Sequence, residues 1–146
     1  MDLNAYLSGY ADGEGCFCVA LSKSKRHAFG WEIRPSFSVS QNRDRAEVLR
    51  LYQDHFGCGS IRPDRSDKTL KYEVRSVRDL VEKVVPHFEK YPLLSSKRKD
   101  FEKFALVCRK MSRGEHLTQK GFKEIIELVF TINAGKRKYN KEAVKI

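Results

Sequence analysis

The sequence lacks features that mark several common classes of protein. No apolar run approaches the roughly 20 residues that a membrane-spanning helix needs. The first residues, Met1-Asp2-Leu3-Asn4, are polar and acidic, whereas a secretory signal peptide has a basic start followed by an apolar run. We therefore expect a soluble, intracellular protein with no membrane partner.

Cysteine and histidine are scarce and lack the spacing of a metal site. The four cysteines, at positions 16, 18, 58 and 108, form no Cys-x-x-Cys pair, and the four histidines are irregularly spaced. Cys16 and Cys18 lie too close along an extended strand to form a comfortable disulfide. We interpret the cysteines as reduced thiols that serve as small apolar residues, and we expect no small-molecule cofactor.

Acidic residues are also fewer than basic ones. The 19 acidic residues face 29 Lys and Arg, which leaves a formal net charge of +10, and the bases are spread along the whole chain. This distribution predicts a broad basic face for a polyanion such as nucleic acid. A basic soluble protein without a nucleic-acid ligand is the alternative. With 146 residues and 40% apolar content, we expect one domain over 1–146, with a core over about 3–132 and a basic frayed tail over about 135–146.

The patterning of apolar residues predicts the order of the elements. Residues 3–12 predict a helix that ends at Asp-Gly-Glu-Gly, and alternation predicts strands over 16–24, 33–40, 59–65 and 69–77, with a turn at 66–68. The pair Asp44 and Glu47 has capping-box spacing before a helix that Gly57 ends. Further helical patterns cover 80–90, where Pro86 predicts a kink or break, then 101–111 and 122–130.

The order helix, two strands, helix, two strands, helix and then further helices predicts an α+β domain with helices on one face of the sheet. The other face would carry polar and basic side chains that can read base edges in the major groove. An ordinary solvated strand face would look similar. The candidate DNA-binding residues are Ser22, Ser24, Arg26, Glu32, Arg34, Ser36, Ser38, Ser40, Arg62, Lys71, Glu73 and Arg75.

Small residues recur along the first predicted helix. Ala5, Gly9 and Gly13 are four positions apart, so they share one helical face. A second helix can approach such a face closely. The alternative is a helix that packs this face against its own sheet.

The most informative stretch, residues 6–17, reads YLSGYADGEGCF. It resembles the signature of the LAGLIDADG homing endonuclease family. The matching positions are Leu7, Gly9, Asp12, Gly13, Glu14 and Gly15, and the substitutions are Ser8, Tyr10 and Ala11. Taken alone, an Asp-x-Glu at a helix end also suits a surface turn. The family's core, αββαββα with a four-stranded antiparallel saddle-shaped sheet, matches the predicted order and is followed here by C-terminal helices.

The resemblance implies a homodimer, because family members with one motif build their active centre from two chains. The residues implied for the interface helix are Ala5, Leu7, Ser8, Gly9 and Asp12. The acidic residue at the foot of each helix is implied to bind a divalent metal. Glu14, with the carbonyl of Gly13, would therefore hold Mg²⁺, for which Mn²⁺ can substitute, because both ions favour oxygen ligands.

The family also surrounds the metal with polar and basic residues. Gln41 and Arg45 match two members of that ring, although Arg45 also suits an ordinary cation near the start of a helix. The third member is a lysine before the next helix, for which we choose Lys97, whereas an ungapped match places Ser95 there.

The function that the resemblance implies is site-specific hydrolysis of both strands of a long, pseudo-palindromic double-stranded DNA target, leaving 3′ overhangs. Two alternatives stay open. One is a catalytically silent relative that binds DNA or RNA as a maturase or regulator, which the presence of Glu14 disfavours. The other is a basic α+β module of unrelated ancestry that binds structured RNA, which does not account for the glycines around Glu14.

Overall fold

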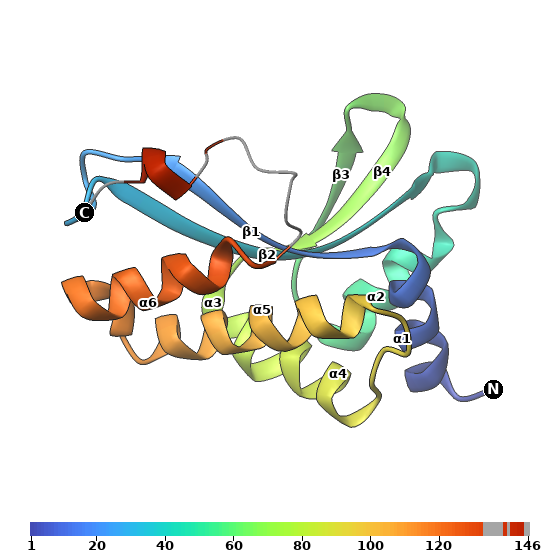
Figure 1. Ribbon diagram of the computed structural model, residues 1–146. Helices are drawn as coiled ribbons and strands as arrows, with labels where there is room; N and C mark the ends of the chain where they lie inside the picture. The colour runs from blue at the N-terminus through green and yellow to red at the C-terminus, as the bar shows by residue number, and fades with distance from the viewer. Residues whose placement is uncertain (133–138, 140, 145–146) are drawn as a thin grey trace.

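The computed structural model describes residues 1–132, 139 and 141–144, and its elements follow the predicted order (Figure 1). The elements are α1 (Leu3–Glu14), β1 (Gly15–Lys23), β2 (Trp31–Asn42), α2 (Glu47–Phe56), β3 (Ser60–Asp64), β4 (Ser66–Val74), α3 (Val77–Asp79), α4 (Val85–Lys90), α5 (Lys97–Ser112) and α6 (Gln119–Val129).

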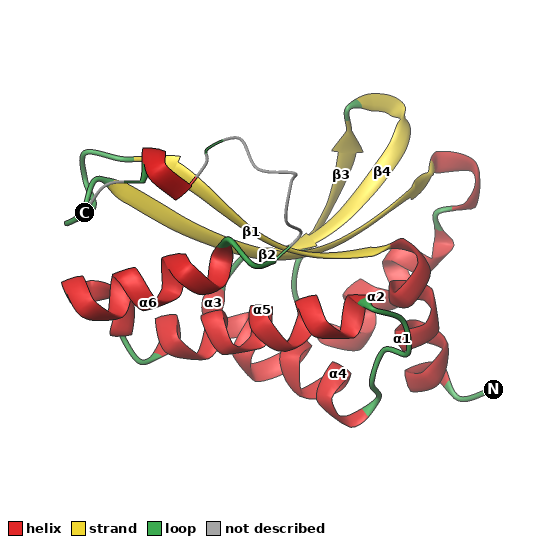
Figure 2. Ribbon diagram, viewed as in Figure 1, coloured by secondary structure: helices red, strands yellow, loops and turns green. Residues whose placement is uncertain are grey.

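The four strands form one antiparallel sheet in the order β1-β2-β4-β3. The helices cover one face of this sheet, and the opposite face is open and concave (Figure 2). Phe17 and Val19 in β1, and Phe37 and Val39 in β2, are buried beneath the helices because alternate side chains of a strand point to the same face. The predicted α+β fold is confirmed.

Helix α1 and strand β1 follow one another without a loop. The Asp2 carboxylate starts the helix by accepting hydrogen bonds from the backbone N–H groups of Asn4 (3.0 Å) and Ala5 (3.3 Å). At the other end, a Cβ at Gly15 would lie 2.8 Å from the carbonyl oxygen of Ala11. Only glycine fits this abrupt change from helix to strand, which places Glu14 at the corner between them.

Two boundary predictions are wrong. Residues 66–68 are not the hairpin turn, because β4 begins at Ser66 and the chain reverses at Arg65, whose φ is +45°, beside a register shift at Pro63/Asp64. Asp44 does not cap α2, because it lies in a 3-10 turn over Arg43–Arg45 and the helix begins without a side-chain cap. Gly57, with φ of +66°, ends α2 as predicted.

The segment that carries Pro86 is not one regular α-helix. A π-helical turn, Leu80–Val84, separates α3 from α4, and the N–H of Val85 donates to the carbonyl of Leu80. Proline has no N–H and crowds the preceding turn, so a local change of helical pitch beside it is expected.

The core lies between the sheet and the helices and is rich in phenylalanine. The ring of Phe17 lies 5.0 Å from Phe37, 5.2 Å from Phe88, 5.1 Å from Phe101 and 5.4 Å from Phe104, measured between centroids. These contacts join β1 and β2 to α4 and α5, so they fix the sheet relative to the helices. None of the helices in the described ranges is long and apolar enough to cross a membrane.

The expectation of a frayed tail is wrong for the part of it that the structure describes. Tyr139 packs edge-on against Trp31 at 4.9 Å, residues Lys141–Ala143 form a 3-10 turn, and Val144 is buried. Apolar side chains thus hold these residues against the end of the sheet. The remaining positions of the predicted tail, 135–138, 140 and 145–146, lie outside the described residues.

Candidate functional site

The candidate metal ligands lie at the foot of α1, where the helix meets β1. Glu14 is exposed, and its carboxylate makes no hydrogen bond or ion pair with the residues that the structure describes. Gly13 precedes it and is also exposed. Within the described ranges, no group of three or more His, Cys, Asp or Glu is placed to hold an ion. One chain therefore offers a single carboxylate and a backbone carbonyl at this corner.

Lys97 lies at the same corner. Its ammonium group donates to the carbonyl oxygens of Ala11 (3.0 Å) and Gly15 (2.6 Å), at the end of α1. These carbonyls carry the partial negative charge of a helix C-terminus, so they are favourable partners for a cation. The first turn of α5 thus places a positive charge at the end of α1, whose last residue is Glu14.

The alternative residue, Ser95, contacts the motif as well, through Asp12. The Asp12 carboxylate accepts hydrogen bonds from the N–H of Leu94 (2.8 Å), the N–H of Ser95 (3.1 Å) and the Ser95 hydroxyl. Burial raises the pKa of Asp12, but these hydrogen bonds and the charge of Lys97 outweigh it, so the pKa lies below its ordinary value. Asp12 therefore fixes the loop before α5 to α1 of its own chain.

Gln41 and Arg45 form a connected group with Tyr10 of α1. The Gln41 amide nitrogen donates to the Tyr10 hydroxyl (2.5 Å), and its oxygen accepts from Arg45 Nε (3.2 Å) and from the N–H of Asn42 (2.8 Å). The sequence analysis gave Tyr10 no role. Its position within the motif, one helical turn before Glu14, was the available signal.

The small-residue face of α1 is open. Ala5, Gly9 and Gly13 are exposed, and a Cβ at either glycine would meet no heavy atom within 4 Å. The chain's own sheet therefore does not cover this face. Leu3 and Tyr6 lie near it, with 38% and 40% of their surfaces exposed.

Two residues expected on the interface helix do not lie on this open face. Leu7 is fully buried in the core, and Ser8 is 5% exposed and bonded to His87 and the carbonyl of Tyr91. Successive helical residues are rotated by about 100°, so Leu7 lies on the side of α1 opposite Ala5 and Gly9, and Ser8 lies at the edge between the two sides. Leu7 and Ser8 are therefore corrected to residues that hold α1 in its own protomer.

Strand register brings most of the candidate DNA-binding residues onto the open face of the sheet. Ser36 pairs with Cys18, Arg34 with Ala20, and Glu32 with Ser22. Across the other strands, the paired positions are Ser38 with Glu73, Ser40 with Lys71, Arg62 with Lys71, and Ser60 with Glu73. Ser24 and Arg26 lie beyond the sheet, in the loop between β1 and β2.

The most enclosed part of this face is a charged cluster around Glu73. Its carboxylate is 9% exposed and lies 2.5 Å from an Arg62 nitrogen, 3.7 Å from Lys71 Nζ and 3.6 Å from Arg75 Nε. Ser38, directly opposite Glu73, is only 8% exposed. Glu73 and Ser38 are thus engaged within the protein. Arg62 is exposed but paired with Glu73, whereas Arg34 is exposed and has no ion pair among the described residues.

Cys16 and Cys18, predicted to serve as small apolar residues, lie on the same face, opposite Ser38 and Ser36. Cys16 is exposed and Cys18 half-buried, so neither belongs to the apolar core, in contrast to the buried Cys108. A hydrogen bond with Cys18 raises the pKa of Cys16 above its ordinary value. Both side chains therefore add small, neutral groups to the open face, as reduced thiols.

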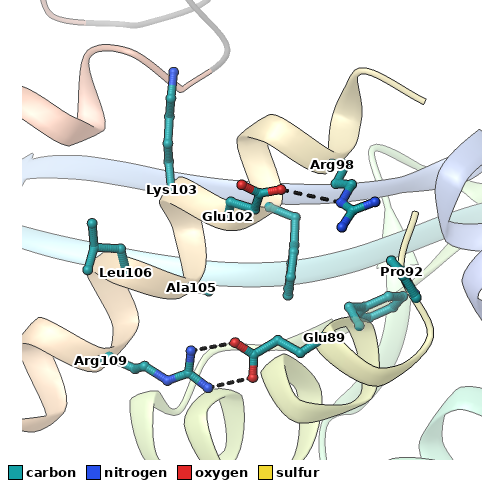
Figure 3. A pocket seen from close by; sticks show the side chains of 10 residues that line it. Glu89, Pro92, Arg98, Glu102, Lys103, Ala105, Leu106 and Arg109 are labelled. Carbon is teal, nitrogen blue, oxygen red and sulfur yellow. Dashed lines mark hydrogen bonds and ion pairs between the residues drawn. The ribbon is translucent and has the colours of Figure 1, made fainter. Parts of the chain in front are cut away.

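A groove of about 690 Å³ lies elsewhere, between α4 and α5 (Figure 3). Its apolar lining includes Phe88 and Phe101. Arg109 and Glu89 close one side with two hydrogen bonds of 2.6 Å. It belongs to the helical layer, whereas the candidate residues lie at the foot of α1 and on the sheet.

Comparisons with known proteins agree with this arrangement. The family described as LAGLIDADG endonuclease matches residues 7–108. A probable intron-encoded endonuclease of Neurospora crassa is 34% identical over 142 residues, which are 95% of this chain and 31% of that protein. The chain spans 24 to 31% of the length of three curated relatives, of which two are probable intron-encoded endonucleases and one is an uncharacterized protein in an intron.

Solved structures show the same fold. The crystal structure of the homing endonuclease I-TnaI is 35% identical, with a TM-score of 0.85, and the match covers 97% of this chain and 92% of that one. I-SmaMI, bound to an uncleaved DNA target in the presence of calcium ions, is 31% identical, with a TM-score of 0.88. That match covers 97% of this chain and 47% of I-SmaMI.

Proposed function

Because the chain belongs to the LAGLIDADG endonuclease family, we propose that it is a homing endonuclease that hydrolyses both strands of a long, pseudo-palindromic DNA site and leaves 3′ overhangs. The observation that carries the proposal is the exposed carboxylate of Glu14 at the foot of α1, which has no partner among the described residues. A carboxylate beside a lysine and a Gln–Arg pair is a suitable set of groups for phosphodiester hydrolysis.

The active form is a homodimer. This sequence holds one motif, and α1 leaves Ala5, Gly9 and Gly13 uncovered. Two such helices can approach closely because glycine and alanine add little bulk between the backbones. Gly13 ends this face and precedes Glu14, so the pairing brings two Glu14 carboxylates near one another.

The donor set fits a divalent cation that prefers oxygen. Glu14 and the Gly13 carbonyl of each protomer would hold Mg²⁺, or Mn²⁺ in its place, together with water and phosphate oxygens. When bound, the ion withdraws charge from the phosphate and makes a water molecule more acidic. The cation also relieves the repulsion between two nearby carboxylates.

The protein's own groups position the reactants around this centre. The Lys97 ammonium, held by two carbonyls of the α1 terminus, adds positive charge where the phosphate becomes more negative. The second amide proton of Gln41 and the guanidinium of Arg45 remain available for water or phosphate oxygens.

The open sheet face binds the DNA. Its concave shape, its exposed Arg34 and Arg62, and the chain's net charge of +10 suit the major groove and its flanking phosphates. I-SmaMI, whose structure this chain resembles, is bound to DNA in its crystals. The hydrogen-bonding groups on β2 and β4 would read base edges.

Substitution of Glu14 tests the proposal. The substrate is a plasmid that carries the host gene's insertion site, that is, the host sequence without the intervening segment. We expect cleavage with Mg²⁺ and none with a chelator, and we expect Glu14→Gln to lower the cleavage rate by at least about 10²-fold because a neutral amide holds the cation poorly. Glu124→Gln, on the exposed surface of α6, is the control and should cut normally.

Two results would contradict the proposal. Cleavage by Glu14→Gln at the rate of the unmodified protein would contradict the proposed role of Glu14 in holding the cation. Tight binding of this plasmid by the unmodified protein without cleavage in Mg²⁺ would favour the catalytically silent DNA- or RNA-binding alternative.

A further inference from the structure

Tyr10 occupies a motif position from which it can act on the residues beside Glu14. Tyr10 and Glu14 are one helical turn apart and therefore neighbours on the surface of α1. The Tyr10 hydroxyl lies 2.5 Å from the amide nitrogen of Gln41, at the end of β2. This contact joins two elements whose residues are 31 positions apart in the sequence.

The hydrogen-bond partners determine which way the Gln41 amide points. Its oxygen accepts from two donors, the N–H of Asn42 at 2.8 Å and Nε of Arg45 at 3.2 Å. Neither donor could face an NH₂ group, so the amide nitrogen must point toward Tyr10, whose hydroxyl oxygen accepts. Tyr10 thereby satisfies one amide proton and leaves the other free.

The ring of Tyr10 is itself held in place. It is half-buried and packs edge-on against Tyr52, with 6.4 Å between centroids. The Tyr52 hydroxyl donates to the carbonyl of Leu7 in α1, at 2.5 Å. A fixed ring presents its oxygen at one place, which a flexible side chain would not do without an entropic cost.

We propose that Tyr10 is a positioning residue for hydrolysis: its hydroxyl holds the Gln41 amide, and through it Arg45, in the orientation that serves the cleavage centre. The inference rests on the proposed function. Terminal amide torsions are broad, so without Tyr10 the Gln41 amide loses one of its fixed partners and samples orientations that do not serve the reaction. Tyr10 itself does not touch the reacting atoms.

The test removes only the hydroxyl. A neutral hydrogen bond contributes about 0.5–1.5 kcal/mol, so Tyr10→Phe should slow single-turnover cleavage in Mg²⁺ by about two- to twelvefold. The affinity for the same DNA in Ca²⁺ should stay unchanged, and the melting temperature should fall by no more than a few degrees, because the ring is retained. Tyr91→Phe is the matched control, since no hydrogen bond of its hydroxyl occurs among the described residues.

A double-mutant cycle separates positioning from packing. In a Gln41→Ala background, Tyr10→Phe should cause no further loss of rate, because the amide on which the hydroxyl acts is gone. An equal loss in both backgrounds, or an unchanged rate for Tyr10→Phe alone, would overturn the inference. Cleavage by the unmodified protein in the same experiments would still support the proposed function. Failure of the unmodified protein to cut would overturn both.

Discussion

The imidazole of His87 is held neutral between α1 and α2. The Ser8 hydroxyl donates to the carbonyl of Tyr91 (2.6 Å), so it must accept from Nε2 of His87 (3.0 Å). Nδ1 of His87 then accepts from Nε2 of His55 (3.1 Å). Burial, and to a smaller extent the nearby His55, lowers the pKa of His87 to about 4. Protonation of His87 would break this chain of hydrogen bonds.

Stability should therefore fall as the pH falls from about 7 to 4. An unfolded histidine has a pKa of about 6.5, so in this window the unfolded chain binds a proton that folded His87 does not. The loss in the free energy of unfolding is at most about 3 kcal/mol. His87→Gln, which can donate to Ser8 and accept from His55, should flatten the dependence in urea titrations between pH 7 and pH 5. His27→Gln, at an exposed position, should leave the pH dependence of stability unchanged. Equal pH dependences of the free energy of unfolding in the two variants would contradict the role of His87.

Residues of the site differ in how far the sequence predicts them. Glu14 and Gly13 belong to one contiguous motif, so their placement at the end of a helix follows from local pattern. The contact between Tyr10 and Gln41 depends on how β2 lies against α1, which no local pattern specifies. The burial of Leu7 and Ser8 likewise depends on which side of α1 meets the core.

At the scale of elements, helix α1 has two faces with different tasks. One side is fixed in the core through Leu7 and Ala11, and the other presents Ala5, Gly9 and Gly13. A glycine within a helix lowers stability by about 0.5–1 kcal/mol relative to alanine, so the stability of the protomer does not explain why glycine occupies positions 9 and 13. Close packing against a second α1 supplies one.

We predict that Gly9→Leu weakens the dimer while leaving the protomer folded. The position is open within the chain, so the larger side chain meets no neighbouring atom at its Cβ. In the dimer it would hold the two helices apart and raise the dissociation constant by about tenfold or more, as sedimentation equilibrium would measure. Lys123→Leu, on exposed α6, adds the same side chain away from the interface and should leave dimerisation unchanged. A normal dimer in Gly9→Leu would show that α1 is not the interface.

The sequence predicts the existence and order of the elements better than their ends. Strands β1 and β2 show clear alternation because one face packs on helices. The tip of the β3–β4 hairpin has exposed residues on both faces, including Ser66, Asp67 and Lys68, so no alternation marks where β4 begins. Polarity alone therefore predicts a turn in this stretch.

The two sides of the molecule differ in both charge and shape. The open side carries exposed Arg34 and Arg62 on a concave sheet. On the helical side, Arg109 is engaged by two hydrogen bonds with Glu89, which lower the pKa of that carboxyl and neutralise the pair (Figure 3). Net charge is predictable from composition, but which cations remain free depends on the fold.

The affinity for DNA should consequently fall steeply with salt concentration. Only the cations of the open side should contribute to this salt dependence. Each phosphate that a lysine or arginine neutralises releases a counterion, so affinity for a duplex with the target site should fall by about 10³-fold or more between about 50 and 200 mM salt. Arg34→Gln should reduce the slope of log affinity against log salt by about 1 per protomer if Arg34 contacts phosphate. Arg109→Gln removes the same charge from the helical side and should leave the slope unchanged. Fluorescence anisotropy in Ca²⁺ measures both, and equal slopes for the two variants would mean that net charge, and not the sheet face, directs binding.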